Sequence, residues 1–367
     1  MSSRKNLRAH EREVETRAAQ ILVVGPFPGT SGGIGTMMGH LDETLSSRSQ
    51  LAFVDPGSTG HRRGWRFLCA LISILTHRKS FDLAHINLSS NGSFYRKVLL
   101  AMALLAVGKP YIIHLHGSEF RQFYDKSPKL VQLSCRLMMR KASSVLVLGR
   151  EWKKFVVESL TCQPGHVHIL PNAVPGPDSV PNREGFGGNI LFTGRVGRRK
   201  GVPELLEAVR QMPADVDWTL TLAGDVTDDE VRKMVVESPE RVISTGWLSQ
   251  SRLRDVLQQN SIFVLPSHAE GLPLSLLDAM AWGLAPVVTD VGSVTDVITD
   301  GKDGILVKVG DAESIRAALL ELISDPARAS ELGNAARLRW EDGYSMKAYR
   351  DRLDDVYDDI LKGLKLS

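Results

Sequence analysis

The chain has 367 residues, of which 43% are apolar and 24% are charged, and its net charge is +3. This composition is typical of a globular protein and excludes the collagen-like, intrinsically disordered and disulfide-rich classes. The length predicts two domains, and no apolar run reaches the ~18 residues of a membrane-spanning helix.

The charge is unevenly divided along the chain. Residues 1–175 contain 23 Lys and Arg against 11 Asp and Glu, whereas residues 176–367 contain 22 against 31. A basic half beside an acidic half indicates an anionic partner for the first half, such as a membrane surface, a lipid phosphate or a nucleic acid.

The N-terminal segment and the cysteines indicate the cellular compartment of the protein. Residues 1–20 carry charges but no apolar core or cleavage site, so we expect a flexible arm and no signal peptide. The three cysteines, Cys69, Cys135 and Cys162, are scattered and odd in number. They predict reduced thiols in a cytoplasmic protein.

Short β-branched segments alternate with segments of helical length, which predicts βαβ units and parallel sheets. Strands are expected near residues 21–25, 51–55, 82–87, 111–117 and 143–149, and again near residues 189–194, 217–225, 241–246, 261–267 and 285–290. We therefore predict an α/β fold with a Rossmann-like domain at 21–175, a Pro- and Gly-rich linker at 176–188, a second Rossmann-like domain at 189–335 and a helical segment at 336–367. Two doubly wound domains bind ligands at the carboxyl ends of their strands, where their loops face a cleft.

A glycine-rich loop follows the first expected strand. Gly32, Gly33 and Gly35 would let the backbone approach a phosphate or an acceptor. A dinucleotide fingerprint is the alternative, because Asp55 ends the next strand, but the third glycine of that motif is missing. The pattern disfavours nicotinamide binding.

Two segments of the first half have apolar centres and basic flanks. They span residues 61–80 and 94–109, and the first contains a tryptophan. This pattern is typical of helices at an anionic membrane surface, and equally of helices packed on a sheet with solvated ends.

The strand "YIIHLHG" places His114 and His116 on one face, with His116 at its end. His114 is expected to be a hydrogen-bonded residue of the sheet. A metal site of His85, His114 and His116 is the alternative, but no acidic residue at ligand spacing supports it, and we expect none.

The segment "GRVGRRKG" opens the second half. Arg195 directly follows a strand and Lys200 lies five residues later, an arrangement suited to the two phosphates of a diphosphate. Arg198 and Arg199 are expected at the surface. The acidic pair Asp215 and Asp217 precedes a strand and is interpreted as a solvated turn, not as a metal-binding motif.

The segment "PSHAEGLPLSLLDAMAWG" carries two carboxylates. Glu270 is expected on the loop after a strand, and Asp278 one turn into the following helix. A helix N-terminus favours anions, so a phosphate between hydroxyl-binding carboxylates, as in a nucleotide sugar, is one interpretation. The other is a helix cap at Glu270 and a solvated Asp278.

Several segments of the chain form a recognisable set: "GRVGRRKG", "PNAV", "LAGD", "GWLS" and residues 267–307. With this set, the chain resembles the retaining glycosyltransferases of family four, also called group 1. The resemblance covers most of residues 21–345. It implies the GT-B fold, in which two Rossmann-like domains face a cleft and a C-terminal helix returns to the first domain. It also implies a nucleoside diphosphate sugar as the donor substrate and no metal or other cofactor.

The resemblance assigns roles to residues. Arg195 and Lys200 would hold the donor diphosphate, and Glu270, with Gly271 and Leu272, would lie beside the donor sugar. Asp278 would contact the ribose, although the family has Glu there, with a side chain one methylene longer. The catalytic group would comprise His116, Glu270, Arg195 and Lys200, and the glycine loop would face the same site. Asp296 stands near the place of a later family Glu and receives no role.

The prediction is a metal-independent, hexosyltransferase-type glycosyltransferase that acts on a lipid-linked or polysaccharide acceptor in cell-surface or exopolysaccharide synthesis. The acceptor would be bound by the basic first domain, with an anionic membrane surface as a partner and no nucleic acid. The expected location is the cytoplasm, at the inner face of the membrane. The alternatives are a nucleotide-sugar epimerase, a phosphorylase or a non-catalytic sugar-binding protein on the same fold.

Overall fold

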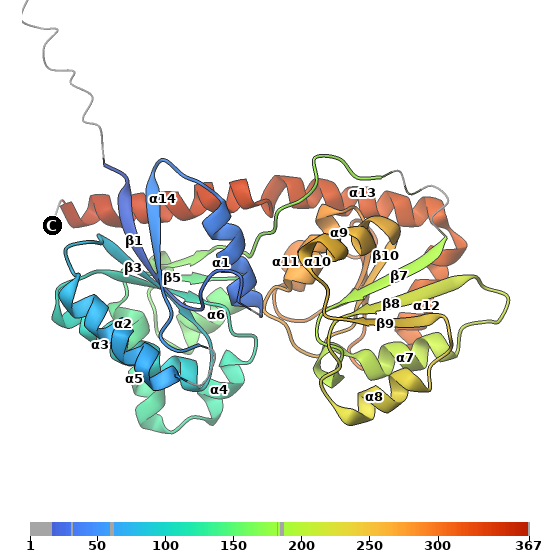
Figure 1. Cartoon of the computed structure of the whole chain (residues 1–367), viewed down its shortest axis with the longest axis horizontal. Helices are drawn as coiled ribbons and strands as arrows, with labels where there is room; N and C mark the ends of the chain where they lie inside the picture. The colour runs from blue at the N-terminus through green and yellow to red at the C-terminus, as the bar shows by residue number, and fades with distance from the viewer. Residues whose placement is uncertain (1–16, 31, 59–61, 182, 184–186, 366–367) are drawn as a thin grey trace, which may run out of the picture.

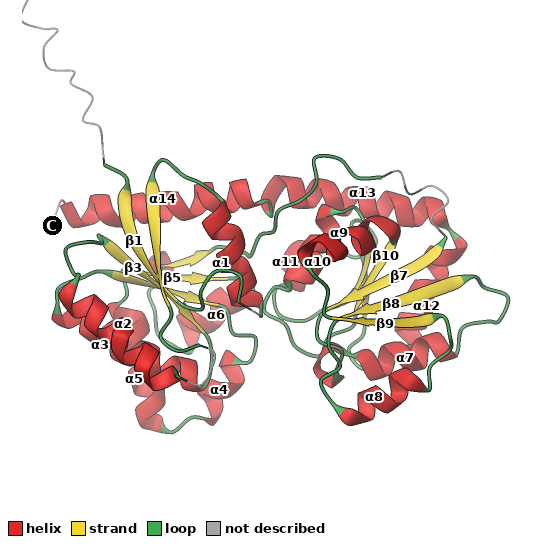
Figure 2. Ribbon diagram, viewed as in Figure 1, coloured by secondary structure: helices red, strands yellow, loops and turns green. Residues whose placement is uncertain are grey.

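The computed structural model of the chain describes residues 17–30, 32–58, 62–181, 183 and 187–365. These residues form two α/β domains that lie side by side, each with a central sheet covered by helices (Figures 1 and 2). Most of the expected N-terminal arm lies outside the described residues.

The first domain contains, in chain order, β1 (Ala19–Val24), α1 (Gly33–Glu43), β2 (Ser49–Val54), α2 (Arg63–Thr76), β3 (Leu83–Leu88), α3 (Gly92–Ala106), β4 (Tyr111–Leu115), α4 (Phe120–Lys126), α5 (Lys129–Lys141), β5 (Ser144–Val147), α6 (Arg150–Glu158), the 3₁₀ turn η1 (Pro164–His166) and β6 (Val167–Ile169). The second contains β7 (Gly188–Thr193), η2 (Arg198–Lys200), α7 (Val202–Arg210), β8 (Trp218–Ala223), α8 (Asp229–Val236), β9 (Val242–Gly246), α9 (Gln250–Gln259), β10 (Ile262–Leu265), α10 (Leu274–Ala281), β11 (Ala285–Thr289), α11 (Val294–Val297), β12 (Ile305–Val307), α12 (Ala312–Ser324) and α13 (Pro326–Gly343). The chain ends with α14 (Met346–Lys365).

Each domain is built on a six-stranded parallel sheet, which confirms the predicted fold class. The strand orders are β2-β1-β3-β4-β5-β6 and β12-β11-β10-β7-β8-β9. The order reverses between β1 and β3 in the first sheet, and between β7 and β10 in the second. Ligands of doubly wound sheets bind outside the carboxyl ends of the strands at such switch points. Arg195, Lys200 and Glu270 all follow strands at the second switch point.

The strands form because both of their faces are buried. All residues of β3, β4, β5, β10 and β11 are buried, as expected for parallel strands with helices on both sides. Several helices of the second domain begin at residues whose side-chain oxygen accepts a hydrogen bond from the first turn, such as Asp228, Ser249 and Asp311.

The last two helices connect the domains. Helix α13 packs on α10 and β11 of the second domain, and the predicted division at residue 335 falls inside it. Helix α14 then returns to the first domain, where Tyr349, Leu353 and Tyr357 join the core that contains β1. Figure 1 shows α13 and α14 running along one side of both domains.

Helix α14 is anchored by a buried polar group. The guanidinium of Arg350 donates to the backbone oxygen of Ser49 over 2.7 Å and lies 3.3 Å from the Asp354 carboxylate, which also accepts from the Ser49 hydroxyl. Because buried charges are stable only when paired, this group ties α14 to the edge strand β2.

The two segments that cross between the domains touch each other. The backbone N–H of Val174 donates to the carbonyl of Tyr344 over 3.2 Å, and Val174 forms a parallel bridge with Ser345. The outward and return crossings therefore meet at one place.

Candidate active site

The site predicted from the sequence lies where loops of the two domains meet. The Asn172 side-chain amide, in the first domain, donates to the Leu272 carbonyl over 2.8 Å. A Cβ atom added to Gly271 would lie 3.3 Å from the backbone oxygen of His116. The loop after β10 therefore lies directly against the carboxyl end of β4, and of the residues expected at the donor sugar, Gly271 is brought against His116.

Two loops of the second domain are bound together at the switch point. The N–H of His268 donates to the Arg199 carbonyl over 2.9 Å, and the Arg199 guanidinium donates to the Ala269 carbonyl over 2.7 Å. Gly201 makes this approach feasible, because its φ is 70° and a Cβ there would lie 1.9 Å from the Pro266 carbonyl oxygen. The loop after β7 is thus held against the loop after β10.

These loops place Lys200 and Glu270 in contact. Lys200 Nζ lies 2.5 Å from Glu270 Oε1, and the Ser267 hydroxyl donates to the same oxygen over 2.7 Å. Both charged side chains are largely buried. Arg199 adds a second cation 3.8 Å from Glu270 Oε2. Because an ammonium has three donors, Lys200 keeps donors for another anion while it holds Glu270.

Arg195 and Asp278 lie on either side of this pair in the chain. Arg195 is exposed on the loop after β7. Asp278 lies on α10 and is half-buried. Burial raises the pKa of Asp278 to about 7, and among the described residues no hydrogen bond or cation offsets that rise. A ligand that donates hydrogen bonds to Asp278 would stabilise the ionised form of this desolvated carboxyl group.

The helix-cap interpretation of Glu270 is not seen. Helix α10 has Pro273 as its N-cap residue and no side-chain cap hydrogen bond. Glu270 instead accepts from Lys200 and Ser267. Asp278 is likewise not a fully solvated helical residue. Both carboxylates therefore lack the local structural roles that were the alternative explanation of the motif.

His116 lies at the end of β4 in a network of polar side chains. Its Nε2 lies 2.8 Å from Asn87 Oδ1, and its ring centroid is 3.9 Å from that of His114. Burial, together with the charges of His85 and Lys97, lowers the pKa of His116 to about 3. The ring is therefore neutral near pH 7, and its single N–H, on Nε2, donates to Asn87 Oδ1.

His85 and His114 lie behind His116 in the sheet. His85 Nε2 lies 3.3 Å from His114 Nδ1, and His85 Nδ1 lies 2.6 Å from the Tyr357 hydroxyl. Burial holds the pKa of His85 at about 3 and that of His114 well below its ordinary value. Within the described residues, no group of His, Cys, Asp and Glu side chains is arranged to hold a metal ion.

The glycine loop surrounds the start of α1. Gly32 is the N-cap residue with a φ of 103°, and a Cβ at Gly32 or Gly33 would meet no atom within 4 Å. Gly35 differs, because a Cβ there would lie 2.2 Å from the Thr30 carbonyl oxygen. Gly32 and Gly33 therefore face open space, whereas Gly35 packs the loop on the helix.

Three contributing residues were missed in the sequence. Asn87 is the next-to-last residue of β3 and links His116 to α1, through a contact with the Met38 sulfur. Arg199 was expected at the surface and is exposed, yet it contacts Glu270. Asp296 received no role, but it binds the first domain by accepting from the Arg150 N–H over 2.7 Å and from its guanidinium over 2.5 Å. Only the position of Asn87 at a strand end was a usable signal.

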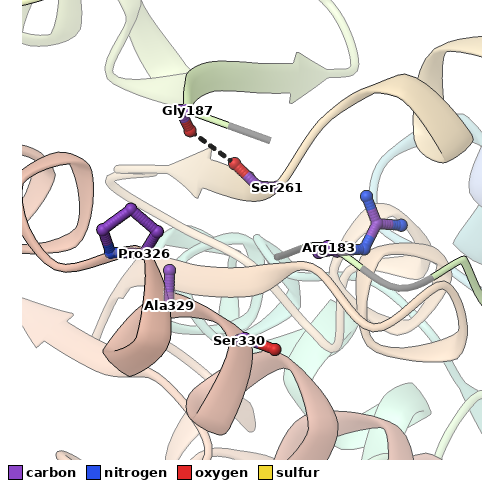
Figure 3. Close-up of a pocket in the computed structure, with 6 residues that line it drawn as sticks. All are labelled: Arg183, Gly187, Ser261, Pro326, Ala329 and Ser330. Carbon is purple, nitrogen blue, oxygen red and sulfur yellow. Dashed lines mark hydrogen bonds between the residues drawn. The ribbon is translucent and has the colours of Figure 1, made fainter. Parts of the chain in front are cut away.

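Two pockets lie away from the Lys200–Glu270 pair. A pocket of about 370 Å³ lies in the first domain between the start of α3, α4 and the start of α5. The other is shown in Figure 3 and is lined by Arg183, Gly187, Ser261, Pro326, Ala329 and Ser330. It leaves no room for a water molecule. Because Arg183 there donates to the carbonyls of Leu257 and Trp282, we interpret that place as structural.

Comparison with known families decides the identity of the chain. The family of group 1 glycosyl transferases matches residues 187–325, and the glycosyl transferase 4-like domain matches residues 42–173. The chain belongs to the group 1 glycosyltransferases. It is an enzyme of the transferase class with the GT-B fold, and the two matches divide it as its two sheets do.

This glycosyltransferase is similar to several characterised proteins over most of its length. It is 27% identical to an alpha-maltose-1-phosphate synthase of Mycolicibacterium smegmatis, covering 84% of this chain and 86% of the relative. It is 24% identical to an Escherichia coli UDP-Gal:alpha-D-GlcNAc-diphosphoundecaprenol alpha-1,3-galactosyltransferase, covering 80% and 79%. The structure of HepE from Anabaena in complex with UDP and glucose superposes with a TM-score of 0.74 at 14% identity, covering 92% and 99%.

Proposed function

We propose that this glycosyltransferase moves a sugar from a nucleoside diphosphate donor to a lipid-linked or polysaccharide acceptor held by the first domain. The observation that carries the proposal is the contact of Lys200 with Glu270 at the switch point of the second sheet, next to Gly271, which lies against His116 of the first domain. The cations that would bind a diphosphate and the carboxylate that would accept hydrogen bonds from sugar hydroxyls therefore lie together, as the binding of a nucleotide sugar requires.

In the proposed reaction, Arg195 and Lys200 bind the diphosphate. The bond between the anomeric carbon and the diphosphate oxygen breaks, an acceptor oxygen takes its place, and the acceptor releases its proton. The two cations stabilise the negative charge that gathers on the departing nucleotide, so no metal is needed for that purpose. The family resemblance suggests retention of the anomeric configuration.

The remaining residues position the donor. Glu270, with Gly271 and Leu272 beside it, accepts hydrogen bonds from the sugar hydroxyls, and Asp278 accepts from the ribose. Neutral His116, held by Asn87, orients a sugar hydroxyl near the reacting carbon. In the first domain, Gly32 and Gly33 offer backbone N–H groups at the start of α1, where an anion or an acceptor would be favoured.

The acceptor class is inferred from the relatives and from charge. One similar enzyme is named for a diphosphoundecaprenol-linked acceptor, and others for a cellobiosyl-diphosphopolyprenol acceptor. The basic first half of the chain suits such an anionic lipid. None of the described helices combines the length and apolar character that crossing a membrane requires. We therefore propose synthesis of cell-surface or exported glycans at the inner membrane face.

Nucleotide binding and release test the proposal. UDP-, GDP- and ADP-sugars are offered to the wild type and to Lys200→Ala, with and without a chelator, and the melting temperature and the released nucleotide are measured. Lys302→Ala is the matched control, because Lys302 is exposed in the same domain. We expect one nucleotide class to raise the melting temperature of the wild type and the control, regardless of chelator.

The Lys200→Ala variant is expected to lose at least tenfold in donor affinity, since a charged hydrogen bond contributes ~1.5–3 kcal/mol. Binding that is unchanged in Lys200→Ala would remove the diphosphate role of that residue. Binding without turnover on any lipid-linked or glycan acceptor would favour a sugar-binding protein. Turnover that needs inorganic phosphate, or that interconverts free nucleotide sugars, would favour a phosphorylase or an epimerase.

A further inference from the structure

Three helices of the first domain expose apolar side chains in regular stripes. Exposed residues include Trp65 and Ile72 on α2, Leu99 and Met102 on α3, and Leu133 and Leu137 on α5. Their spacings of three, four and seven residues place each set on one side of its helix. The opposite sides of α2 and α3 bury Ala70, Ile74, Leu100 and Leu104 in the core. Each helix is therefore apolar on its outer side as well as on its inner side.

The three stripes form one surface. Helix α3 contacts both α2 and α5, and Figure 1 shows the three helices side by side on one face of the domain. We call the exposed apolar residues of α2, α3 and α5 the docking face. Monomeric proteins rarely expose contiguous apolar patches larger than a few hundred Å², so a surface of this kind indicates a binding partner.

The charged side chains of the three helices have one sign. None of the three helices contains an Asp or a Glu. Exposed cations stand at their ends, including Arg62 and Arg63 before and within α2, Lys79 after it, and Arg140 and Lys141 at the end of α5. Helices of the second domain differ, because α8 and α12 carry carboxylates in their first turns. An apolar centre with a cationic rim is complementary to a bilayer with anionic headgroups.

We infer that the docking face binds an anionic lipid membrane. The pocket of about 370 Å³ supports this orientation, because Tyr95 of α3 and the start of α5 line it together with Asn91, Glu119 and Phe123. The pocket therefore lies at the edge of the docking face and beside the carboxyl ends of β3 and β4. An amphiphilic acceptor would keep its tail in the bilayer and its polar head in this pocket. That placement of the acceptor rests on the proposed function, whereas membrane binding itself does not.

Vesicle sedimentation with the full chain tests the inference. The probes are vesicles of phosphatidylcholine alone and of equal parts phosphatidylcholine and phosphatidylglycerol, and the bound fraction is measured as the salt concentration rises. We expect binding to the anionic vesicles, much weaker binding to the neutral ones, and loss of the difference at high salt. Each cation near the surface contributes about fivefold to the partition coefficient.

The decisive variant is Met102→Ser with Leu133→Ser. These side chains are 60% and 62% exposed, so the fold should tolerate their loss. The matched control is Val236→Ser with Leu338→Ser, whose side chains are 80% and 65% exposed on the second domain. We expect the first pair to weaken vesicle binding at least tenfold and the control pair to bind as the wild type does. Melting temperatures confirm that both pairs fold.

Several outcomes would overturn the inference. They are a wild type that does not bind anionic vesicles, equal binding by both pairs of variants, or a concentration-dependent dimer that only the Met102→Ser pair abolishes. The last result would make the partner a second copy of the chain. Nucleotide release with a soluble acceptor is measured in parallel. If nucleotide release persists while vesicle binding is absent, the docking inference fails and the proposed sugar transfer stands. If vesicle binding is present while no nucleotide is released, the docking inference stands and the proposed sugar transfer fails.

Discussion

Replacing Asp278 with Asn should stabilise the free protein and weaken donor binding. Burial raises the pKa of this carboxyl from 3.8 to about 7. Ionisation in the folded state therefore costs free energy that the unfolded chain does not pay. At ~1.36 kcal/mol per pKa unit, this shift corresponds to a cost of about 4 kcal/mol. That value is an upper limit, because the side chain is only half-buried and keeps some hydration. An amide of the same shape never ionises.

The pH dependence follows from the direction of the shift. Because the folded pKa lies above the unfolded one, the cost is absent below about pH 4, grows by ~1.4 kcal/mol per pH unit, and levels off above pH 7. The gain in the free energy of unfolding from Asp278→Asn should thus be at most about 1.5 kcal/mol at pH 5 and at most about 4 kcal/mol at pH 8. Urea unfolding followed by tryptophan fluorescence measures it. The exposed Asp217, replaced by Asn, is the control.

Donor binding should change in the opposite sense. A carboxylate accepts hydrogen bonds from ribose hydroxyls more strongly than a carboxylic acid does, so wild-type affinity should rise between pH 6 and pH 8. The Asp278→Asn variant should bind about tenfold or more weakly at pH 8 and show no such rise. A stability gain that is equal at pH 5 and pH 8 would refute the desolvated carboxylate. Unchanged affinity at pH 8 would refute the ribose contact.

Two further predictions concern the cleft. Asp296→Asn should lower kcat/KM about tenfold and increase the radius of gyration measured by X-ray scattering, while the melting temperature changes little, because it weakens an exposed contact with Arg150. An unchanged radius would contradict a role in holding the domains together. His116→Phe should lower kcat at least a hundredfold with donor affinity nearly retained. The wild-type kcat at saturating donor should not vary from pH 5 to pH 8, because the pKa of His116 is about 3. A titration near pH 6.5 that the variant abolishes would contradict this account.

The fold could be predicted from the sequence because buried parallel strands are continuous apolar runs. The strands β6 and β12 were missed, since each has three residues and too little pattern. The contact of Lys200 with Glu270 joins residues that are far apart in the chain, so spacing could suggest both residues but not their pairing. The raised pKa of Asp278 depends on neighbours brought there by folding.

The apolar surface was only partly foreseen. Segments near α2 and α3 showed basic flanks and apolar centres in the sequence. Helix α5 did not, because its exposed leucines alternate with buried Cys135, Met138 and Met139 in a pattern that also fits a helix buried on one side. Which of two apolar sides faces water is decided by the sheet on which a helix packs, and sequence periodicity does not carry that information.

The meeting of Val174 with Tyr344 and Ser345 has a consequence for modular engineering. Because α14 belongs structurally to the first domain, a chimera that exchanges the second domain with that of a relative cannot be made with a single junction. It needs one junction near residue 174 and another near residue 345. Since these two places are adjacent in space, the exchanged domain would enter as an insertion with neighbouring ends, and the first domain would keep both β1 and α14.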